Sequence, residues 1–354
     1  MNRDLEKWLN WTWQNRDEIM DWAHRSTHKT ERTHIYGFDH NKGIKMIYGY
    51  YTGVLGGQAT ENVTAQEARN PNYNQFAGNL ALAKLELGSA TVSIQGGDHD
   101  VSASDLQALT TDQTAGKFFY FIREDMATTK RVYINLNPDL RGDTFRRILG
   151  KIWKVDGLDR AKVAGPGGQD RVDTVVIYCK DQKAQDEVVE KLRKYNEDNR
   201  GRFRMPLPKL VKPVEGLTGI GCASEPPDVQ IFRKKGKTFF VKNGGQSFGA
   251  YRSEIIFTAL EETLSMQAMP AIENARHSRP AGGMPTDGRI RNVVDQMRQP
   301  VSAGRMPLND QVRKRMFKEK ALQFLRAGGV TSSDPAKQND LTGKVVERAR
   351  GRQG

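Results

Sequence analysis

The sequence predicts an α+β fold in which a mixed or antiparallel sheet is covered by helices. A helix is expected at the N-terminus and a flexible basic tail at the C-terminus. Three observations predict this class. Apolar residues recur at helical spacing over the first 25 residues, strand and helix patterns alternate over 117–197, and Pro, Gly and Arg dominate beyond 267. Alternating strand and helix segments pack as a sheet beneath helices.

Length and charge limit the classes of protein to which the chain can belong. A chain of 354 residues can bury a sizeable core, yet only 37% of its residues are hydrophobic and its mean hydropathy is -0.67, so part of it is expected to be poorly ordered. The net charge of +13 is uneven, because residues 267–354 hold 17 Lys and Arg against 8 Asp and Glu. A basic tail is more typical of a docking or solubilising appendage than of a nucleic-acid-binding body, so nucleic acid is not the expected partner.

Cysteine usage and apolar runs indicate the compartment. Cys179 and Cys222 are the only cysteines and stand in no paired motif, which argues against a disulfide framework or a cysteine zinc site. No apolar run approaches the roughly 20 residues that cross a bilayer, and the N-terminus lacks the pattern of a cleavable signal. We therefore expect a soluble, cytoplasmic protein with no membrane partner, no metal and no cofactor.

Residues 1–116 are expected to form an N-terminal helical and mixed region. Leu5, Trp8, Leu9 and Ile19 mark one face of a helix over 2–25. Further on, apolar and β-branched residues predict strands at 44–51 and 90–95, with glycine pairs as turns.

Residues 117–266 are expected to form an α/β core. In its second strand Val132, Ile134 and Leu136 alternate with polar residues, which predicts one core face and one polar face. A hairpin is expected at 229–242. The strands and helices expected in this core are strands at 117–122, 131–137 and 172–179, and helices at 145–152, 182–197 and 248–266.

Residues 267–354 are expected to be a basic, largely flexible tail. One segment differs, because near 309–327 an apolar stripe runs amid Arg and Lys residues and predicts an amphipathic helix. This helix is interpreted as a docking element or as a solvated helix.

Polar groups that favour an anion occur at three points of the core. Ser247 and Gly249 open the helix over 248–266, where unpaired N–H groups and the positive end of the helix dipole meet, and Arg252 follows within one turn. The segments 162–166 and 171–173 place Lys, Arg and Asp near strand ends, where α/β folds commonly build sites. Together they indicate a cleft that handles an anion.

These motifs also carry a resemblance. Their order along the chain is Lys162-Val163-Ala164-Gly165-Pro166, then Asp173 before Val175-Val176-Ile177-Tyr178, then Gly219-Ile220-Gly221, and finally Ser247-Phe248-Gly249 before Arg252. The chain resembles the Hop-A family of type III secretion effectors and the related domains of lanthipeptide and thioamitide biosynthesis. The similarity covers 117–266 well and the first 116 residues weakly. Each motif is short, so the shared order carries the match.

The resemblance implies two activities. One is that of a virulence protein delivered into a host cell. The other is that of a lyase that works with a kinase-like enzyme and eliminates phosphate from phosphorylated Ser or Thr in a peptide. The motif from Ser247 to Arg252 looks closer to the biosynthetic relatives. The tryptophan-rich first helix departs from the serine-rich start of typical effectors.

Elimination of phosphate requires a base, groups that stabilise the developing oxyanion, and cations for the leaving group. We assign the base to Lys162, with Asp173 to orient it or Arg171, and with Tyr133 as the third catalytic residue. Asn135 is expected to orient the substrate. The phosphate-binding residues expected are Arg131, Arg171, Arg252, Ser247 and Gly249, because guanidinium groups bind phosphate in a bidentate way.

Structural interpretations of the same residues stay open. Lys162 could be a surface or salt-bridged lysine, and Arg171 with Asp173 could be a structural ion pair. Tyr133 and Asn135 could line a solvated sheet face. Arg252 could be a solvated helix charge, and Ser247 could be the N-cap of the helix.

The sequence thus predicts a phosphoserine or phosphothreonine lyase-like protein that acts on a phosphorylated peptide or protein, with a kinase-like enzyme as a further partner. The alternative is a non-enzymatic effector that binds a host protein or a secretion chaperone and reaches the host through a type III system. The first interpretation makes the chain an enzyme and the alternative does not, and both stay open.

Overall fold

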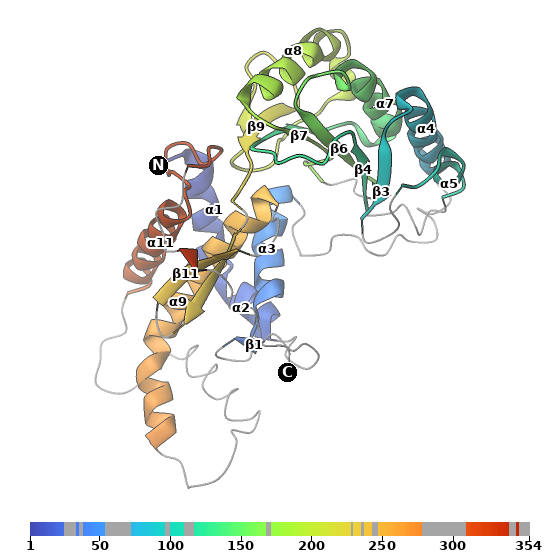
Figure 1. Ribbon diagram of the computed structural model, residues 1–354. Helices are drawn as coiled ribbons and strands as arrows, with labels where there is room; N and C mark the ends of the chain where they lie inside the picture. Colours follow the sequence, from blue (N-terminus) through green and yellow to red (C-terminus); the bar gives the residue numbers. More distant parts are fainter. Residues whose placement is uncertain are drawn as a thin grey trace.

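The structure is a computed structural model that confirms the expected α+β class (Figure 1). It describes residues 1–24, 33–34, 38–53, 72–95, 100–109, 117–167, 171–227, 229–234, 237–242, 247–277, 309–339 and 345–346. Its main element is a seven-stranded sheet with the order β3-β4-β6-β7-β5-β9-β8, in which all neighbours are antiparallel. The strands are β3 Thr91–Ile94, β4 Phe118–Ile122, β5 Lys130–Ile134, β6 Leu158–Ala164, β7 Val175–Cys179, β8 Lys212–Pro213 and β9 Ile220–Ser224.

One face of the sheet carries the first hydrophobic core. Val132, Ile134 and Leu136 point into it, as their alternation predicts, and they are fully buried. The helices and turns around this core are α4 Asn72–Leu87, α5 Ala103–Gln107, η2 Pro138–Leu140, α7 Arg141–Ile152, α8 Gln182–Asp198 and η3 Arg200–Arg202. Helix α8 begins where Asp181 accepts a hydrogen bond from the Ala184 amide.

The opposite face of the sheet meets a second core. Tyr133 and Val176 of the sheet share this core with Phe248 and Tyr251, and Figure 1 shows the helices that form it as a bundle beside the sheet. These helices are α1 Arg3–Gln14, α2 Arg16–His24, α3 His40–Thr52, α9 Phe248–His277 and α11 Asp310–Ala327. The expected polar face of the sheet is therefore covered where α3 and α9 pack on it.

Two expectations for the N-terminal region are corrected. Residues 44–51 form part of helix α3 and not a strand, because Ile47 and Tyr51 lie one turn apart on the face that packs in the second core. Aromatic and β-branched residues favour strands only weakly, and this packing overrides the preference. The single helix expected over 2–25 is divided at Asn15, whose backbone N–H and side-chain amide both donate to the Trp11 carbonyl.

The amphipathic helix expected near 309–327 is present as α11. Its apolar stripe packs inside this chain against α9 and α1, with Phe317, Ala321, Phe324 and Leu325 buried. Helix α9 continues to His277, beyond the residue 266 that was expected. The rest of the expected tail, 278–308, 340–344 and 347–354, lies outside the described residues.

The remaining strands are short. The expected hairpin is present as β10 Val229–Lys234 and β11 Lys237–Lys242, and β12 Val345–Val346 pairs with β11 in parallel. A further pair joins β1 Thr33–His34 to β2 Phe38–Asp39. In the parts of the chain that the structure describes, no helix combines the length and the apolar character needed to cross a bilayer.

Glycine at position 249 lets α9 approach α3 closely. A Cβ atom added there would overlap the Tyr51 ring, which is itself buried. We expect Gly249→Ala to lower the free energy of unfolding by about 1–3 kcal/mol, the usual cost of an overpacked core. Urea denaturation followed by tryptophan fluorescence measures the change.

Gly150→Ala is the matched control. Gly150 lies on the exposed face of α7 with no atom near the position of an added Cβ. Alanine is the better helix former, so this variant is expected to be up to about 1 kcal/mol more stable than the parent. Equal effects of the two substitutions would contradict the close approach of α3 and α9.

Candidate functional site

Antiparallel pairing places several of the expected site residues on one face of the sheet. Lys162 pairs with Tyr120 on one side and with Val176 on the other, and Val176 pairs in turn with Tyr133. Residues directly opposite each other on paired strands share a face, so these four form one row. The next row contains Arg160, Tyr178 and Arg131. We call Lys162, Arg131, Arg171, Tyr133 and Tyr178 the Lys162 cluster.

Lys162 is buried among aromatic rings. Its side chain lies on the second face of the sheet, the residue is only 8% exposed, and its Nζ is 4.1 Å from the centre of the Phe118 ring, 5.7 Å from Tyr120 and 6.0 Å from Tyr178. Within the described residues no carboxylate lies at ion-pair distance from this ammonium group. Contacts between a cation and aromatic faces stabilise its charge only in part.

The surroundings of Lys162 lower its pKa. Burial has the largest effect, because it penalises the charged form, and Arg131 and Arg171 add to it by repulsion. Tyr120 and Asp173 act in the opposite direction without reversing the shift. The interpretation of Lys162 as an exposed surface lysine is therefore excluded.

Arg171 and Asp173 form a bidentate ion pair. The distances are 2.9 Å from Nε to Oδ1 and 2.9 Å from Nη2 to Oδ2, and both residues precede β7 instead of lying on it. The Tyr48 hydroxyl lies 3.4 Å from each of them, and the Arg171 guanidinium stands 4.9 Å from the centre of the Phe118 ring. Burial opposes the charge on Arg171, but Asp173 raises its pKa above the usual range.

Arg131 is held in the same way. It donates to both carboxylate oxygens of Glu225 and, over 3.3 Å, to the Tyr133 hydroxyl. Its guanidinium lies 4.7 Å from the centre of the Tyr178 ring. Burial raises the pKa of Tyr133 to about 12, so its phenol remains protonated and can donate a hydrogen bond at neutral pH.

Arg252 comes to this region from α9. It is fully buried, donates to the Pro335 carbonyl over 3.1 Å, and lies 3.6 Å over the Phe248 ring, which in turn is 6.0 Å from the ring of Tyr133. Burial lowers its pKa to about 10. Its Nη2 is buried with no hydrogen-bond partner among the described residues. Arg252 is therefore not a solvated helix charge.

Besides Asp173 and Arg252, three further expected residues lie outside the Lys162 cluster. Asn135 donates to the Pro206 carbonyl and accepts from Arg204, so it holds a loop. The Ser247 hydroxyl accepts from the Ala250 amide and caps α9, as the structural interpretation predicted. Gly249 faces the ring of Tyr51.

Sequence reasoning missed Glu225 and Tyr48. The aromatic neighbours of Lys162 could have been predicted from the sequence. Phe118 and Tyr120 are two positions apart in an expected strand, so their side chains lie on the same face. Among the described residues, no group of three His, Cys, Asp or Glu side chains could hold a metal ion.

Lys162→Met is expected to stabilise the protein at neutral pH. The pKa of Lys162 is lower in the folded state than in the unfolded state, so the unfolded chain binds more protons between the two values and stability rises with pH there. Below both values the cost of the buried charge is fully present. Methionine removes it, and we expect a gain of about 1 kcal/mol at pH 7 that shrinks towards pH 10.

Urea denaturation at both pH values measures this gain. Lys183→Met, at an exposed position of α8, is the control and should change stability by less than about 0.5 kcal/mol. A gain of the same size at pH 7 and at pH 10 would show that the charge of Lys162 carries no cost.

The fold and the site define a class: α+β proteins with a lysine and arginine cluster buried between a sheet and a helical bundle. Residues 110–281 match the model of the HopA1 effector protein family. The match confirms the resemblance to the Hop-A family. It contains the whole Lys162 cluster with Asp173, Glu225 and Arg252.

Two solved structures of effector proteins are similar to this chain. One is from Pseudomonas syringae pv. tomato strain DC3000, with 16% identity, a TM-score of 0.49, and coverage of 93% of this chain and 99% of the other. The second is from Pseudomonas syringae pv. syringae strain 61, with 14% identity, a TM-score of 0.46, and coverage of 93% and 98%. No curated protein matches the chain.

Proposed function

We propose that this protein is an effector that acts inside a host cell by binding a partner protein, and that the Lys162 cluster receives a phosphorylated side chain of that partner. The match of residues 110–281 to the model of the effector family supports the first part. The observation that carries the second part is the meeting of three cations. Lys162 and Arg131 share one sheet face, and Arg171, which precedes β7, lies against the same Phe118 ring as Lys162.

The charges of the cluster favour an anion. Arg131 is paired with Glu225 and Arg171 with Asp173, so the charge of Lys162 is in excess. An excess charge in a desolvated site is costly, and an anion that reaches it offsets that cost. The two guanidinium groups are already oriented by their carboxylates, and a phosphate can accept hydrogen bonds from such groups in a bidentate way. Tyr120 and Tyr178 are only half-buried, which leaves this side of the cluster open to solvent.

Binding of phosphopeptides tests this function. A fluorescent phosphothreonine peptide should bind at least about tenfold more tightly than the same peptide without phosphate, since charged hydrogen bonds are lost with the phosphate. Lys162→Met should remove most of the difference, and Lys183→Met should leave it unchanged. Equal affinity for the two peptides in fluorescence anisotropy would contradict the proposed site.

Delivery into a host cell is tested separately. The chain fused to an enzyme reporter that is active only in host cytosol should give a signal when a bacterium with a type III system is the donor. A donor that lacks the secretion apparatus is the control. Absence of a signal from the donor with the apparatus would mean that the protein stays in the bacterial cytoplasm, as the sequence first predicted. In that test a secretion chaperone is the expected bacterial partner.

A second function, elimination of phosphate, is favoured by the environment of Lys162. A lysine serves as a base only when its pKa is lowered, and burial beside two guanidinium groups lowers that of Lys162. In the reaction Lys162 Nζ takes the α-proton of a phosphothreonine, the electron pair of that C–H bond forms the new double bond, and the Cβ–O bond breaks. Phosphate leaves with the electrons of that bond, and Arg131 and Arg171 stabilise its charge.

Mass spectrometry separates this function from binding alone. Incubation with a phosphothreonine peptide should give a dehydrated product and free phosphate, and Lys162→Met should abolish the product. A kinase-like enzyme supplied with a Ser- and Thr-rich precursor peptide is the further partner to include. Recovery of bound but unmodified peptide would reject elimination and leave the binding function intact.

A further inference from the structure

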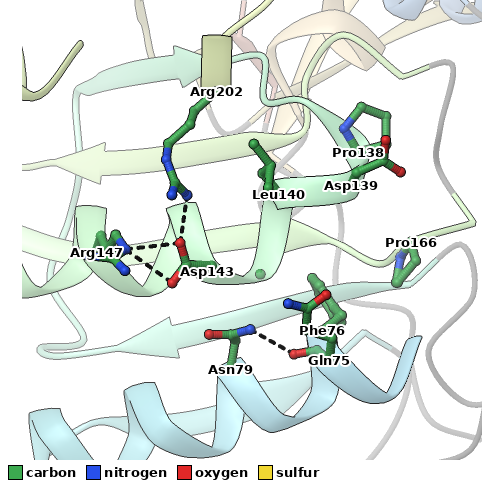
Figure 2. Close-up of a pocket in the computed structure, with 11 residues that line it drawn as sticks. Gln75, Phe76, Asn79, Pro138, Asp139, Leu140, Asp143, Arg147, Pro166 and Arg202 are labelled. Carbon is green, nitrogen blue, oxygen red and sulfur yellow. Dashed lines mark hydrogen bonds and ion pairs between the residues drawn. The ribbon is translucent and has the colours of Figure 1, made fainter. Parts of the chain in front are cut away.

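A cavity lies on the side of the sheet opposite the Lys162 cluster, between α4, η2, α7 and η3. It has a volume of about 270 Å³, and Figure 2 shows the residues that line it. This is slightly below the range of about 300–1,000 Å³ that is typical of small-molecule sites. A ligand of the size of one amino-acid residue fits such a volume.

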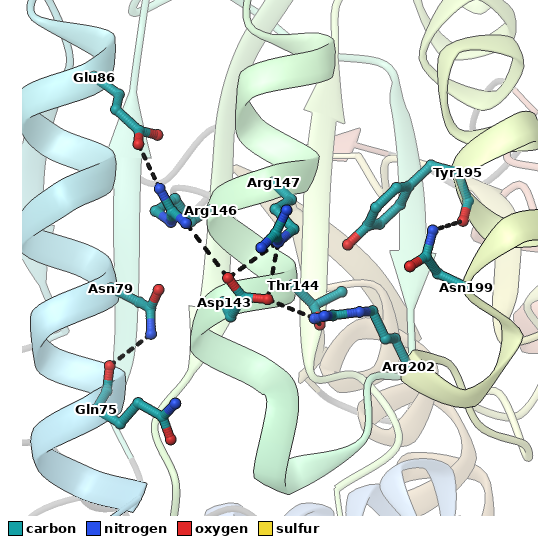
Figure 3. Close-up of polar contacts among 10 residues, drawn as sticks. All are labelled: Gln75, Asn79, Glu86, Asp143, Thr144, Arg146, Arg147, Tyr195, Asn199 and Arg202. Carbon is teal, nitrogen blue, oxygen red and sulfur yellow. Dashed lines mark hydrogen bonds and ion pairs between the residues drawn. The ribbon is translucent and has the colours of Figure 1, made fainter.

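One end of the cavity is built around Asp143. Its carboxylate accepts hydrogen bonds from Arg147 Nε over 2.9 and 3.1 Å and from Arg202 Nη1 over 2.6 Å (Figure 3). Arg202 also donates to the Thr144 hydroxyl over 3.1 Å. Burial works against the charge of Asp143, but the hydrogen bonds from Arg147 and Arg202 lower its pKa, so it is ionised at neutral pH.

The charges at this end do not balance. A third guanidinium, that of Arg146, reaches Asp143 over 3.4 Å but is also paired with Glu86. Arg147 and Arg202 both line the cavity and share the single carboxylate of Asp143, which leaves one positive charge in excess. Within the described part of the chain, the terminal nitrogens of Arg147 and Nη2 of Arg202 have no hydrogen-bond acceptor.

The other residues that line the cavity indicate the chemistry of the rest of the ligand. Phe76, Leu140 and Pro166 are apolar, and the side-chain amide of Gln75 has no hydrogen-bond partner among the described residues. Asp139 lies away from Arg147 in Figure 2 and disfavours an anion at its own end. The cavity therefore offers donors at one end and apolar contacts in the middle, with the Asp139 carboxylate at the far end.

We propose that this cavity binds the carboxylate of a single amino-acid residue, either of a free amino acid or at the C-terminus of a peptide. The carboxylate lies between Arg147 and Arg202 and completes their charge balance in a bidentate arrangement. The apolar body of the residue packs on Phe76 and Leu140. An N–H group of the ligand faces Asp139. This site is separate from the Lys162 cluster and does not depend on the function proposed for it.

Calorimetric titration with three probes tests the proposal: N-acetyl-leucine, N-acetyl-leucinamide and leucine. N-acetyl-leucine represents a peptide terminus and leucine the free amino acid, and binding of either one supports the site and identifies its source. The amide should bind at least about tenfold more weakly than the acid, because it lacks the charge. Equal binding of acid and amide, or binding of neither acid probe, would overturn the proposal.

Variants locate the site. Arg147 is 51% exposed in its side chain, so Arg147→Gln should fold and should weaken binding of the acid about tenfold or more. Arg193→Gln, on α8 in an exposed pair with Glu190, is the matched control and should leave binding unchanged. Lys162→Met should also leave it unchanged. Unaltered binding in Arg147→Gln, or inorganic phosphate binding as tightly as N-acetyl-leucine, would refute the assignment.

Discussion

Replacement of Glu225 by alanine is expected to lower the free energy of unfolding by about 3 kcal/mol, because Arg131 then stays buried without this carboxylate. The Arg131 side chain is only 4% exposed and that of Glu225 19%. The guanidinium would keep contacts with Tyr133 and Tyr178, but these rings carry no full negative charge. Guanidinium chloride denaturation at pH 7 measures the loss.

Two variants control this experiment. Glu190→Ala removes an exposed partner of Arg193 and should cost less than about 1 kcal/mol. The double variant Arg131→Met with Glu225→Ala removes both charges and should recover part of the stability lost in Glu225→Ala. A loss no larger for Glu225→Ala than for Glu190→Ala would show that the guanidinium is not desolvated.

Phe317→Ala is expected to cost about 3–5 kcal/mol, the range for deletion of a buried aromatic side chain. Phe317 of α11 is fully buried, and its ring centre lies 5.7 Å from that of Trp13 in α1. The substitution therefore opens a cavity between the first and the last described helices of the chain. Thermal and urea denaturation, followed through tryptophan fluorescence, measure the effect.

Val312→Ala on the same helix is the matched control. Val312 is 42% exposed, so its truncation should change stability by less than about 0.5 kcal/mol. If Phe317→Ala behaved like Val312→Ala, helix α11 would not belong to the second core in solution.

The fold class could be predicted because local patterns agree with it. The alternation around Val132 predicts β5, and the apolar stripe of Ile148, Leu149 and Ile152 predicts α7. Neither prediction requires knowledge of the elements that pack against them. Helix α3 could not be recognised in this way, because Ile47, Tyr48 and Tyr51 have strand-like composition and become helical through packing against α9.

The site was predictable to a lesser extent. Lys162, Arg131 and Arg171 were chosen by residue type and by their places near strand ends. The sheet register places the first two on one face, and Arg171 lies with Lys162 against the Phe118 ring. Their roles stay predictions. The partner of Arg131 could not be identified from the residues near it in the sequence. Glu225 lies 94 positions further along the chain, and only the pairing of β5 with β9 makes them neighbours.

Arg141 joins helix α7 to the end of strand β6. From the first turn of α7 its Nη1 donates to the Ala164 and Gly165 carbonyls over 3.3 and 2.7 Å, and the Gly165 amide donates to Lys117 over 2.8 Å. A strand end fixed by a helix cannot fray by itself. The amide hydrogens of Ala164 and Gly165 should therefore exchange with solvent deuterium only when the whole first core opens, although they border a loop.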